Sequence, residues 1–409
     1  MKNESDRPDS TSVSPRRGML EEPSFGWGEI APRKPTLREI FVEWFDAINF
    51  FKNPARLLTA MFTAFHIATF VVFVYFSIRH FSILNVAVIT GIAMMIAIIY
   101  NTLWYHRYCT HRAYRFSHPA WTRLFLWTNP VCFREESYVI PHRVHHAKED
   151  KPGDPYGPHL GWLGSYLASE SSAKTNLTIN RSDYERLAEG LKHIGIPLNS
   201  YEQFQRTGSV EKAWHWITRS IFANLVWCSL AFLINGGVGV LAWLSGVFLY
   251  TFVVRDFNYR GHGGFFLRAS EGRAANHILY GIVSGEWHRN HHANPRLAHS
   301  GFKWWQLDLP YYCIKAMSLC GIVEQMNTLK GNAPRQRVKV AGEKEMHRVH
   351  SHSVRDSKCT EALDRLTIGS RCAGSDGRHS PQNSGPTVQR SSRVEDGLAC
   401  ESPTRSRRS

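Results

Sequence analysis

The chain has 409 residues, of which 43% are hydrophobic, and its net charge is +15. Its mean hydropathy of −0.30 would suit a soluble protein, but that average combines polar ends with an apolar middle. The positive charge comes with no recognition-helix or RNA-binding pattern, which argues against nucleic acid and fits attraction to anionic lipid. The eight cysteines form no Cys-x-x-Cys pair, so we expect free thiols in a reducing compartment.

Both ends of the chain have the composition of disordered segments. Residues 1–35 are rich in Pro, Ser, Arg and Glu, and residues 331–409 are basic and rich in Ser, Arg, Gly and Thr. Such segments bury too little apolar surface to offset the entropy of ordering. We therefore predict a single folded domain over residues 36–330. The N-terminus lacks the pattern of a secretory signal, so no cleavage is expected.

A short amphipathic helix is expected before the apolar middle. In residues 35–51 the side chains of Phe41, Trp44, Phe45, Ile48 and Phe51 recur at helical spacing. Such a helix can lie in the membrane interface, or it can pack on a cytoplasmic domain. The pattern alone leaves both alternatives open.

Four segments are apolar and long enough to cross a bilayer, which requires about 20 residues. They cover residues 57–76, 83–105, 217–234 and 238–254. The second is apolar on every face, which a soluble core helix would not be. Asn235, Gly236 and Gly237 separate the last two segments and predict a tight hairpin at one membrane face. The fold class we expect is an all-α integral membrane protein with four transmembrane helices and a cytoplasmic helical cap.

The basic residues set the expected orientation, because Lys and Arg concentrate in cytoplasmic loops. Only Arg79 lies between the first two segments, and the turn at 235–237 has no basic residue. The flanks on the other side carry many more: Lys52, Arg56, Arg107, Arg112, Arg115, Lys212, Arg219, Arg255, Arg260 and Arg268. The chain should therefore cross the membrane four times, with both termini and the long middle loop in the cytoplasm.

Histidines cluster in three boxes on this expected cytoplasmic side. HRYCTHR contains His106 and His111, HRVHH contains His142, His145 and His146, and HRNHH contains His288, His291 and His292. Residues three and four apart share a face of a helix, so each HxxHH can point into one pocket. His106 and His111 are about 140° apart on an ideal α-helix, so they should serve two metals or lie where the helix ends.

Asn258 and His262 lie four residues apart after the last apolar segment, and complete a candidate ligand set of nine histidines and one asparagine. That number suits two metal ions with four or five ligands each. Structural zinc needs four ligands and commonly uses Cys, and catalytic zinc keeps three protein ligands. Imidazole also suits iron and copper, so two redox metals with open positions are the better match.

In these motifs the sequence resembles the membrane fatty acid desaturase family over roughly residues 50–325, and is most similar to its delta-nine acyl-CoA and acyl-lipid branch. The three boxes occur in the family's order, and His262 and Asn258 match an extra ligand and a water-holding asparagine of that branch. The stretches DPYGPHLGW (154–162) and WWQLD (304–308) also look familiar. The sequence departs from the family at Tyr138, where Trp is usual, and at Arg289 and Asn290.

The resemblance implies a histidine-ligated diiron oxidoreductase that uses O2 to insert a cis double bond, with delta-nine expected, into a long acyl chain on CoA or lipid. Two Fe ions would be the cofactors, and Asn258 would act through a water. Electrons would come from a separate ferredoxin or small haem cytochrome with its reductase. Arg115, Arg143 or Lys148 could meet a CoA or lipid phosphate. The expected location is a membrane, with a bacterial inner membrane favoured over the endoplasmic reticulum.

The ligand set leaves other reactions open. A hydroxylase or a decarboxylase that forms a terminal alkene could use the same site, because the outcome depends on how the substrate is held. A zinc-dependent membrane hydrolase and a catalytically silent protein that binds lipid or metal are further alternatives. Product analysis distinguishes the first two reactions from desaturation, and metal analysis identifies a zinc enzyme.

Overall fold

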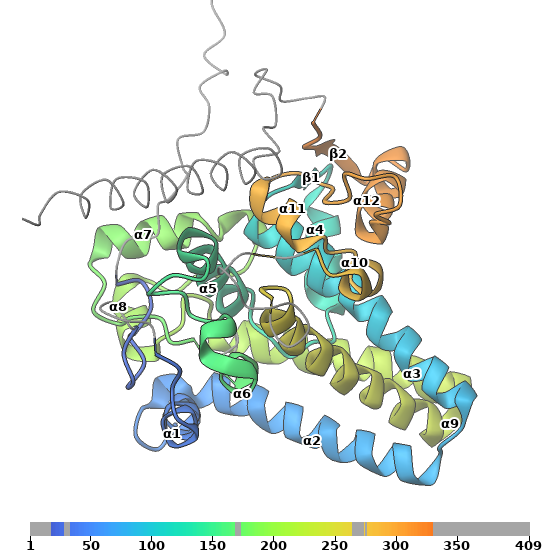
Figure 1. Cartoon of the computed structure of the whole chain (residues 1–409), viewed down its shortest axis with the longest axis horizontal. Helices are drawn as coiled ribbons and strands as arrows, with labels where there is room; N and C mark the ends of the chain where they lie inside the picture. The colour runs from blue at the N-terminus through green and yellow to red at the C-terminus, as the bar shows by residue number, and fades with distance from the viewer. Residues whose placement is uncertain (1–17, 28–32, 168–172, 264–273, 275, 330–409) are drawn as a thin grey trace, which may run out of the picture. The chain divides into compact units, whose positions relative to one another are not determined.

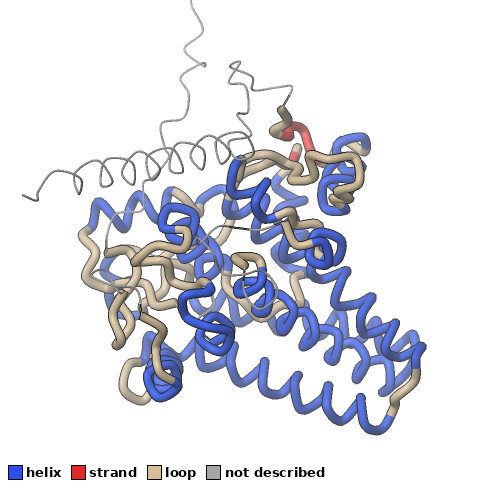
Figure 2. Tube along the Cα trace, viewed as in Figure 1, coloured by secondary structure: helices blue, strands red, loops and turns tan. Residues whose placement is uncertain are grey.

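The computed structural model describes residues 18–27, 33–167, 173–263, 274 and 276–329, which belong to a compact unit over residues 1–334. Helices dominate this unit, and the described strands form a two-stranded antiparallel sheet (Figure 2). The predicted C-terminal tail lies outside the described residues. The elements are α1 (Leu37–Ile48), η2 (Pro54–Arg56), α2 (Leu57–Arg79), α3 (Ile83–Ile96), η3 (Ala97–Thr110), β1 (Tyr114–Phe116), α4 (Pro119–Thr128), α5 (Glu135–Lys148), η4 (Pro158–Leu160), α6 (Gly161–Leu167), α7 (Arg181–Glu189), η5 (Lys192–Ile194), α8 (Tyr201–Thr207), α9 (Ala213–Arg260), α10 (Ile278–Val283), α11 (His288–Ala293), α12 (Leu309–Leu319) and β2 (Val323–Met326).

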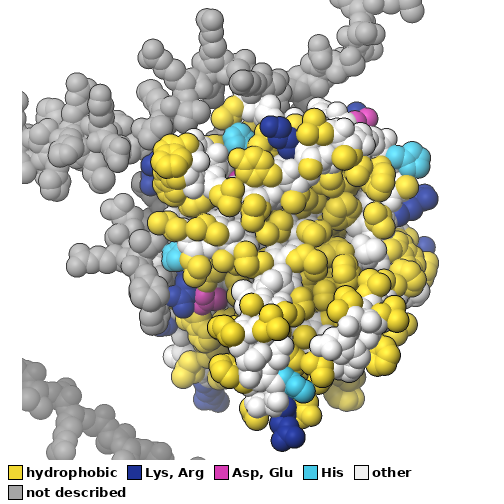
Figure 3. All heavy atoms as spheres, turned by 90° about the vertical axis from the view of Figure 1, so that its right-hand side faces the viewer, with side chains coloured by type: hydrophobic (Ala, Val, Ile, Leu, Met, Phe, Trp, Pro, Cys, Tyr) yellow, Lys and Arg dark blue, Asp and Glu magenta, His cyan; other side chains and the backbone are white. Residues whose placement is uncertain are grey.

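Within the described residues, three helices are long and apolar enough to cross a membrane: residues 54–79, 83–110 and 213–260. α2, α3 and α9 lie side by side (Figure 1). Large apolar side chains on them face outward, and Ile78 is 74% exposed. One side of the described unit is largely hydrophobic, with basic side chains mainly toward its edges (Figure 3). A surface of this kind is suited to lipid rather than water.

The helix α9 reverses direction in its middle. Asn235 and Gly236 leave helical geometry, and the φ of +54° at Gly236 is one that glycine adopts without steric cost. The rings of Trp227 and Trp243 stack with their centroids 4.6 Å apart, although 16 residues of straight helix span about 24 Å. The two halves therefore form a hairpin at the break that the sequence predicted, and they contain the third and fourth predicted segments.

α1 both packs on the protein and exposes apolar side chains. Thr36 and Glu39 form a capping box that fixes its start. Ile40 is buried beside α6, whereas Phe45 is 57% exposed and Phe51, just beyond the helix, is 88% exposed. The buried face shows that α1 packs on the protein, and the placement of its exposed apolar face in a membrane interface stays a prediction.

Residues 18–27 pack against the folded unit, although they fall within the predicted N-terminal tail. Met19 and Leu20 are buried, and Leu20 forms a β-bridge with Thr175. The folded region therefore includes this part of 1–35. The low overall hydrophobicity of residues 1–35 predicted a tail, although Met19 and Leu20 pack into the folded unit.

A buried ion-pair network joins the start of α5 to α9. Arg219 contacts the carboxylates of Glu135 and Glu211, and all three side chains are at most 2% exposed. Trp104 Nε1 donates a 3.1 Å hydrogen bond to Glu135. The sequence analysis counted Arg219 among the cytoplasmic flanking charges. In the structure its guanidinium is buried in ion pairs and does not face lipid.

Candidate metal centre

The nine predicted histidines converge in two groups. His106, His111, His142, His146 and His291 form a five-histidine group, and His145, His262, His288 and His292 form a four-histidine group. Within each group, one nitrogen per residue lies within 4.8 Å of the others. The two groups adjoin each other, because the rings of His146 and His292 stack with centroids 4.2 Å apart.

His106 and His111 belong to the same group, so the expectation that they would serve two different metals is not what the structure shows. Their ring centroids are 4.9 Å apart. η3 is a π-helix, and His111 N–H donates to the carbonyl of His106, five residues earlier. The wider π turn brings residues five apart onto one face, where an α-helix would separate them. His111 also caps this helix, as the alternative prediction allowed.

Each HxxHH box divides between the two groups instead of pointing into one of them. His142 and His146, four apart on α5, enter the five-histidine group, and His145 between them enters the other. On α11, His291 joins the first group, and His288 and His292 join the second. The same spacing thus lets one helical turn supply both groups.

Carboxylates lie beside the Nδ1 atoms of several histidines. His145 Nδ1 lies 2.8 Å from Asp154, His262 Nδ1 3.2 Å from Asp150, and His292 Nδ1 2.9 Å from Glu149. The contacts of His145 and His262 are hydrogen bonds, which their Nδ1 atoms donate because a carboxylate accepts, whereas His292 Nδ1 only lies near Glu149. In His145 and His262, Nε2 then faces the group, the arrangement that metal-binding histidines use.

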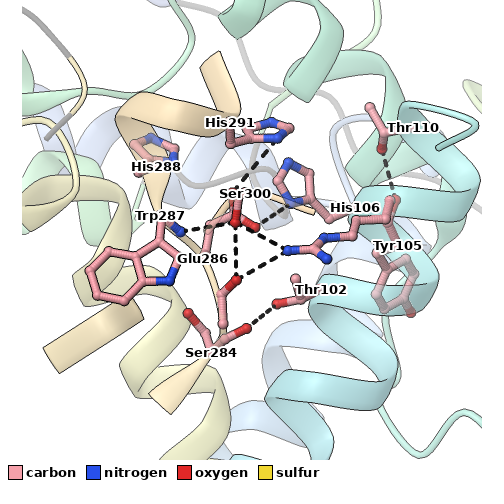
Figure 4. Close-up of polar contacts among 12 residues, drawn as sticks. Thr102, Tyr105, His106, Thr110, Ser284, Glu286, Trp287, His288, His291 and Ser300 are labelled. Carbon is pink, nitrogen blue, oxygen red and sulfur yellow. Dashed lines mark hydrogen bonds and ion pairs between the residues drawn. The ribbon is translucent and has the colours of Figure 1, made fainter. Parts of the chain in front are cut away.

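The buried carboxylate of Glu286 lies beside two histidines of the five-histidine group. Its carboxylate lies 3.2 Å from His106 Nδ1 and 3.7 Å from His291 Nδ1, and its side chain is 4% exposed (Figure 4). The chain segment that carries Glu286 is fixed by Arg107, which is buried and binds Asp308 at 2.9 Å and the Gly285 carbonyl at 3.1 Å. Asp308 belongs to the WWQLD stretch, so that stretch anchors the third box.

The donor atoms fit metal ions. The Nε2 atoms of His106, His111, His145 and His292 are buried and make no hydrogen bond within the described residues. Other Nε2 atoms face each other: His142 and His146 at 3.1 Å, and His262 and His288 at 2.7 Å. Buried nitrogen lone pairs without a hydrogen-bond donor destabilise a fold, and a metal cation shared among them would remove this cost.

Burial keeps these imidazoles uncharged. It lowers the pKa of His142, His145, His146, His288 and His291 well below the usual value, and neighbouring histidines lower it further. The neutral form is the one that binds a metal. Burial also raises the pKa of Asp154 to about 7, opposed by the charges of His262 and His159.

A cavity opens beside the histidines and extends between η3 and α9. Its walls include His106, His142, His145, His262 and His288. The apolar part comes from Ala97, Val253, Val254 and Phe257, and Asn101, Tyr138, Tyr156, Asn258, Tyr280, Ser284 and Glu286 complete the lining. Asn258 is buried on α9, one turn before His262. Apolar side chains thus lie next to the histidines along one wall of this cavity.

The predicted phosphate-binding residues occupy separate places. Arg115 is 68% exposed on β1 and pairs with Glu324. Arg143 is half-buried, and its Nη2 donates to the carbonyls of Thr110 and Gly190. Lys148 ends α5, and its side chain lies along Gly153. None of the three lines the cavity at the histidines.

Several residues of the centre escaped the sequence analysis. Glu286, Glu149 and Asp150 were not singled out, and Asp154 was noted only as part of a familiar stretch. Glu286 precedes the third box by two residues, and Glu149 and Asp150 follow the second by three and four. An acidic residue within four positions of a histidine box is the pattern that could have identified them.

These features define a helical protein with long apolar helices and a buried polyhistidine centre that adjoins an apolar cavity. The sequence profile of the fatty acid desaturase family ("Fatty acid desaturase") matches residues 81–311, more than half of the chain. The protein therefore belongs to the fatty acid desaturase family, whose members are oxidoreductases that act on lipid or acyl substrates.

Relatives in this family differ in substrate and double-bond position. The chain is 24% identical over 233 residues to delta-9 desaturase-like 4 protein of Arabidopsis thaliana, covering 54% of this chain and 69% of the relative. It is 25% identical to sn-1 stearoyl-lipid 9-desaturase of Anabaena variabilis, covering 54% and 76%. It is 27% identical to an acyl-CoA 5-desaturase of Anemone leveillei, covering 54% and 65%.

Proposed function

We propose that this protein is an O2-dependent acyl desaturase that inserts a cis double bond, at the delta-nine position, into a long saturated acyl chain on CoA or lipid. The observation that carries this proposal is the pair of histidine groups beside the cavity between η3 and α9, where the Nε2 atoms of His106 and His145 are buried and make no hydrogen bond within the described residues. Relatives named as delta-nine desaturases support the position, although a relative named as a 5-desaturase has similar identity.

The two groups are proposed to hold one iron ion each. The five-histidine group would use His106, His111, His142, His146 and His291, and the four-histidine group would use His145, His262, His288 and His292. Asn258 would complete the second site through a water, because it lines the same cavity wall as His262 and His288. When bound, the iron ions would supply the redox chemistry that activates O2.

The reaction balances with two external electrons. A –CH2–CH2– unit, O2, two electrons and two protons yield –CH=CH– and two molecules of water. The protein's part is to hold two neighbouring methylenes against the histidine groups and to exclude bulk water. Val253, Val254 and Phe257 supply apolar walls next to His262. Asp154 and Glu286 keep His145 and His106 in the orientation that presents Nε2 to the site.

The chain is proposed to cross the membrane four times, through α2, α3 with η3, and the two halves of α9. The halves before and after the break at 235–236 contain 22 and 24 residues, or about 33 and 36 Å of helix. Each length suffices for a hydrocarbon core of about 30 Å. Both termini and the histidine centre would be cytoplasmic, in a bacterial inner membrane, and α1 would lie in the interface through its exposed Phe45.

The product test uses cells that express the wild type or His145→Ala, with fatty-acid methyl esters profiled in each. We expect a new monounsaturated acid with the wild type only, and two iron ions per purified wild-type chain. A hydroxy acid or terminal alkene would refute desaturation while keeping the centre. Zinc in place of iron, with no oxidised product from any electron donor, would refute the proposal altogether.

A second test concerns the acyl headgroup. Arg115→Gln, Arg143→Gln and Lys148→Gln are each compared with the wild type by the KM for acyl-CoA. A residue that binds a CoA phosphate should raise this KM when it is replaced. An unchanged KM removes that residue from the substrate site.

A further inference from the structure

Three arginines from distant parts of the sequence meet beside the five-histidine group. Arg112 follows η3, Arg143 lies on α5, and Arg296 follows α11. Arg112 and Arg143 each donate from Nη2 to the carbonyl oxygen of Gly190, both at 3.3 Å. Two guanidinium groups that share one acceptor lie within a few ångströms of each other.

Asn327 brings the third arginine to this place. Its Nδ2 donates to the backbone oxygen of Arg112 at 3.2 Å and to that of Arg296 at 3.1 Å. The backbone of Asn327 also bonds Ala113 and Ala298, which fixes both loops to the end of β2. We call Arg112, Arg143 and Arg296 the arginine cluster. The fold therefore holds the backbones of Arg112 and Arg296 together, and the charge of Arg296 acts on Arg143.

The arginine cluster has no ion pair with a carboxylate among the described residues. The nearby carboxylates are already paired, Glu189 with Lys192 and Glu324 with Arg115. Burial, together with the charges of Arg112 and Arg296, lowers the pKa of Arg143 to about 10, which leaves it charged at neutral pH. Clustered like charges repel each other, so an anionic partner would bind here favourably.

Capping of α7 explains only part of this arrangement. The carbonyls of Glu189 and Gly190 end that helix and accept bonds from Arg112 and Arg143. Arg296 is exposed, and its guanidinium makes no hydrogen bond within the described part of the chain. Arg112 also holds a φ of +50°, which is uncommon for a residue other than glycine and directs the chain out of η3.

The arginine cluster approaches the centre from a different side than the cavity. Arg112 follows His111 directly, and His111 is partly exposed. Neither His111 nor any of the three arginines lines the cavity that reaches His106 and His288. An anionic group at the arginine cluster would therefore lie close to the five-histidine group without entering the space available to an acyl chain.

We propose that the arginine cluster is the docking surface for an acidic redox protein, which delivers electrons to the five-histidine group on the His111 side. This rests on the proposed function, since the reaction needs two electrons from outside. A one-electron carrier would dock twice per turnover and leave oxidised each time. Charge complementarity of this kind mainly raises the association rate and weakens as salt screens it.

The test compares wild type with the double variant Arg112→Gln/Arg296→Gln, both exposed positions. Arg123→Gln/Arg206→Gln is the matched control, since both arginines are exposed and have no ion pair within the described residues. Purified proteins are assayed with a reduced plant-type ferredoxin and with a cytochrome b5 domain, each at low and high salt. A single turnover after anaerobic chemical reduction gives the carrier-independent rate.

We expect kcat/KM for at least one carrier to fall on the order of tenfold in the double variant at low salt, and the difference to shrink at high salt. The single-turnover rate and the KM for the acyl substrate should not change, and the control should match the wild type. Gly190→Ala provides a second variant, because its Cβ would lie 2.5 Å from Arg143 Nη1 and should move that group.

Equal carrier dependence in wild type and double variant overturns the inference, as does failure of both carriers to bind wild type at low salt. A raised KM for acyl-CoA with unchanged carrier kinetics would assign the arginine cluster to the substrate phosphate instead, and would equally overturn it. The failure of the proposed function itself is distinct, because chemically reduced wild type would then form no unsaturated product.

Discussion

If the two histidine groups hold iron as proposed, replacement of Glu286 by Gln should weaken one of the two proposed metal sites and leave the other intact. The Glu286 carboxylate is buried and lies 3.2 Å from His106 Nδ1 and 3.7 Å from His291 Nδ1. Both histidines belong to the five-histidine group. Loss of a carboxylate that orients a metal-binding histidine typically costs 10–100-fold in metal affinity, about 1.4–2.7 kcal/mol. Because the Glu286 carboxylate lies within ion-pair distance of two histidines, we expect a loss of about 100-fold.

The assay titrates iron-loaded protein with a chelator and counts the iron retained per chain. Glu286→Gln should shift the release of one iron to lower chelator concentration. Asp154→Asn, which affects His145 in the four-histidine group, should shift the release of the other. The double variant should show both shifts, and Glu185→Gln at an exposed site of α7 should show none. Release of both irons from Glu286→Gln at the wild-type concentration would refute the assignment of Glu286 to this role.

Three further outcomes follow from the fold. Gly239→Ala should lower the free energy of unfolding by about 1–3 kcal/mol, because the new Cβ would lie 2.1 Å from the Ala231 backbone oxygen. The thermal midpoint of the detergent-solubilised protein should fall accordingly. An unchanged midpoint would contradict the close hairpin. Arg219→Met should lower the free energy of unfolding by about 3–5 kcal/mol in the same melt, because Glu135 and Glu211 stay buried without the arginine. The triple variant, in which both glutamates are also replaced by Gln, should recover much of this loss. Chelation of all metal should lower the wild-type midpoint, because buried imidazole nitrogens then lose their ligand; equal midpoints for metal-free and loaded protein would show that the histidines are not metal-bound.

Much of the chemistry could be read from local sequence. The three boxes, with His262, name all nine histidines that the structure gathers, because clustered histidine is rare and its spacing is visible without a fold. The chain reversal within α9 was likewise predictable, since Asn235 and Gly236 interrupt an otherwise apolar run and Gly236 adopts a positive φ. Both features depend on neighbours within a few residues.

The division of the histidines required the tertiary structure. Periodicity predicted that His106 and His111 point apart, but the π-helical η3 brings them together. Whether a helix widens to a π turn depends on what packs around it, and sequence spacing assumes the α-helical turn.

The contacts that prepare the site were also decided by the fold. The carboxylate of Asp150 reaches His262 across 112 residues, and Arg107 reaches Asp308 across 201. The arginine cluster exists because Asn327 ties together loops that carry Arg112 and Arg296. The sequence by itself therefore determined which histidines converge. Only long-range packing decided which groups they form and which carboxylates lie beside them, because such packing joins residues whose separation along the chain contains no periodic pattern.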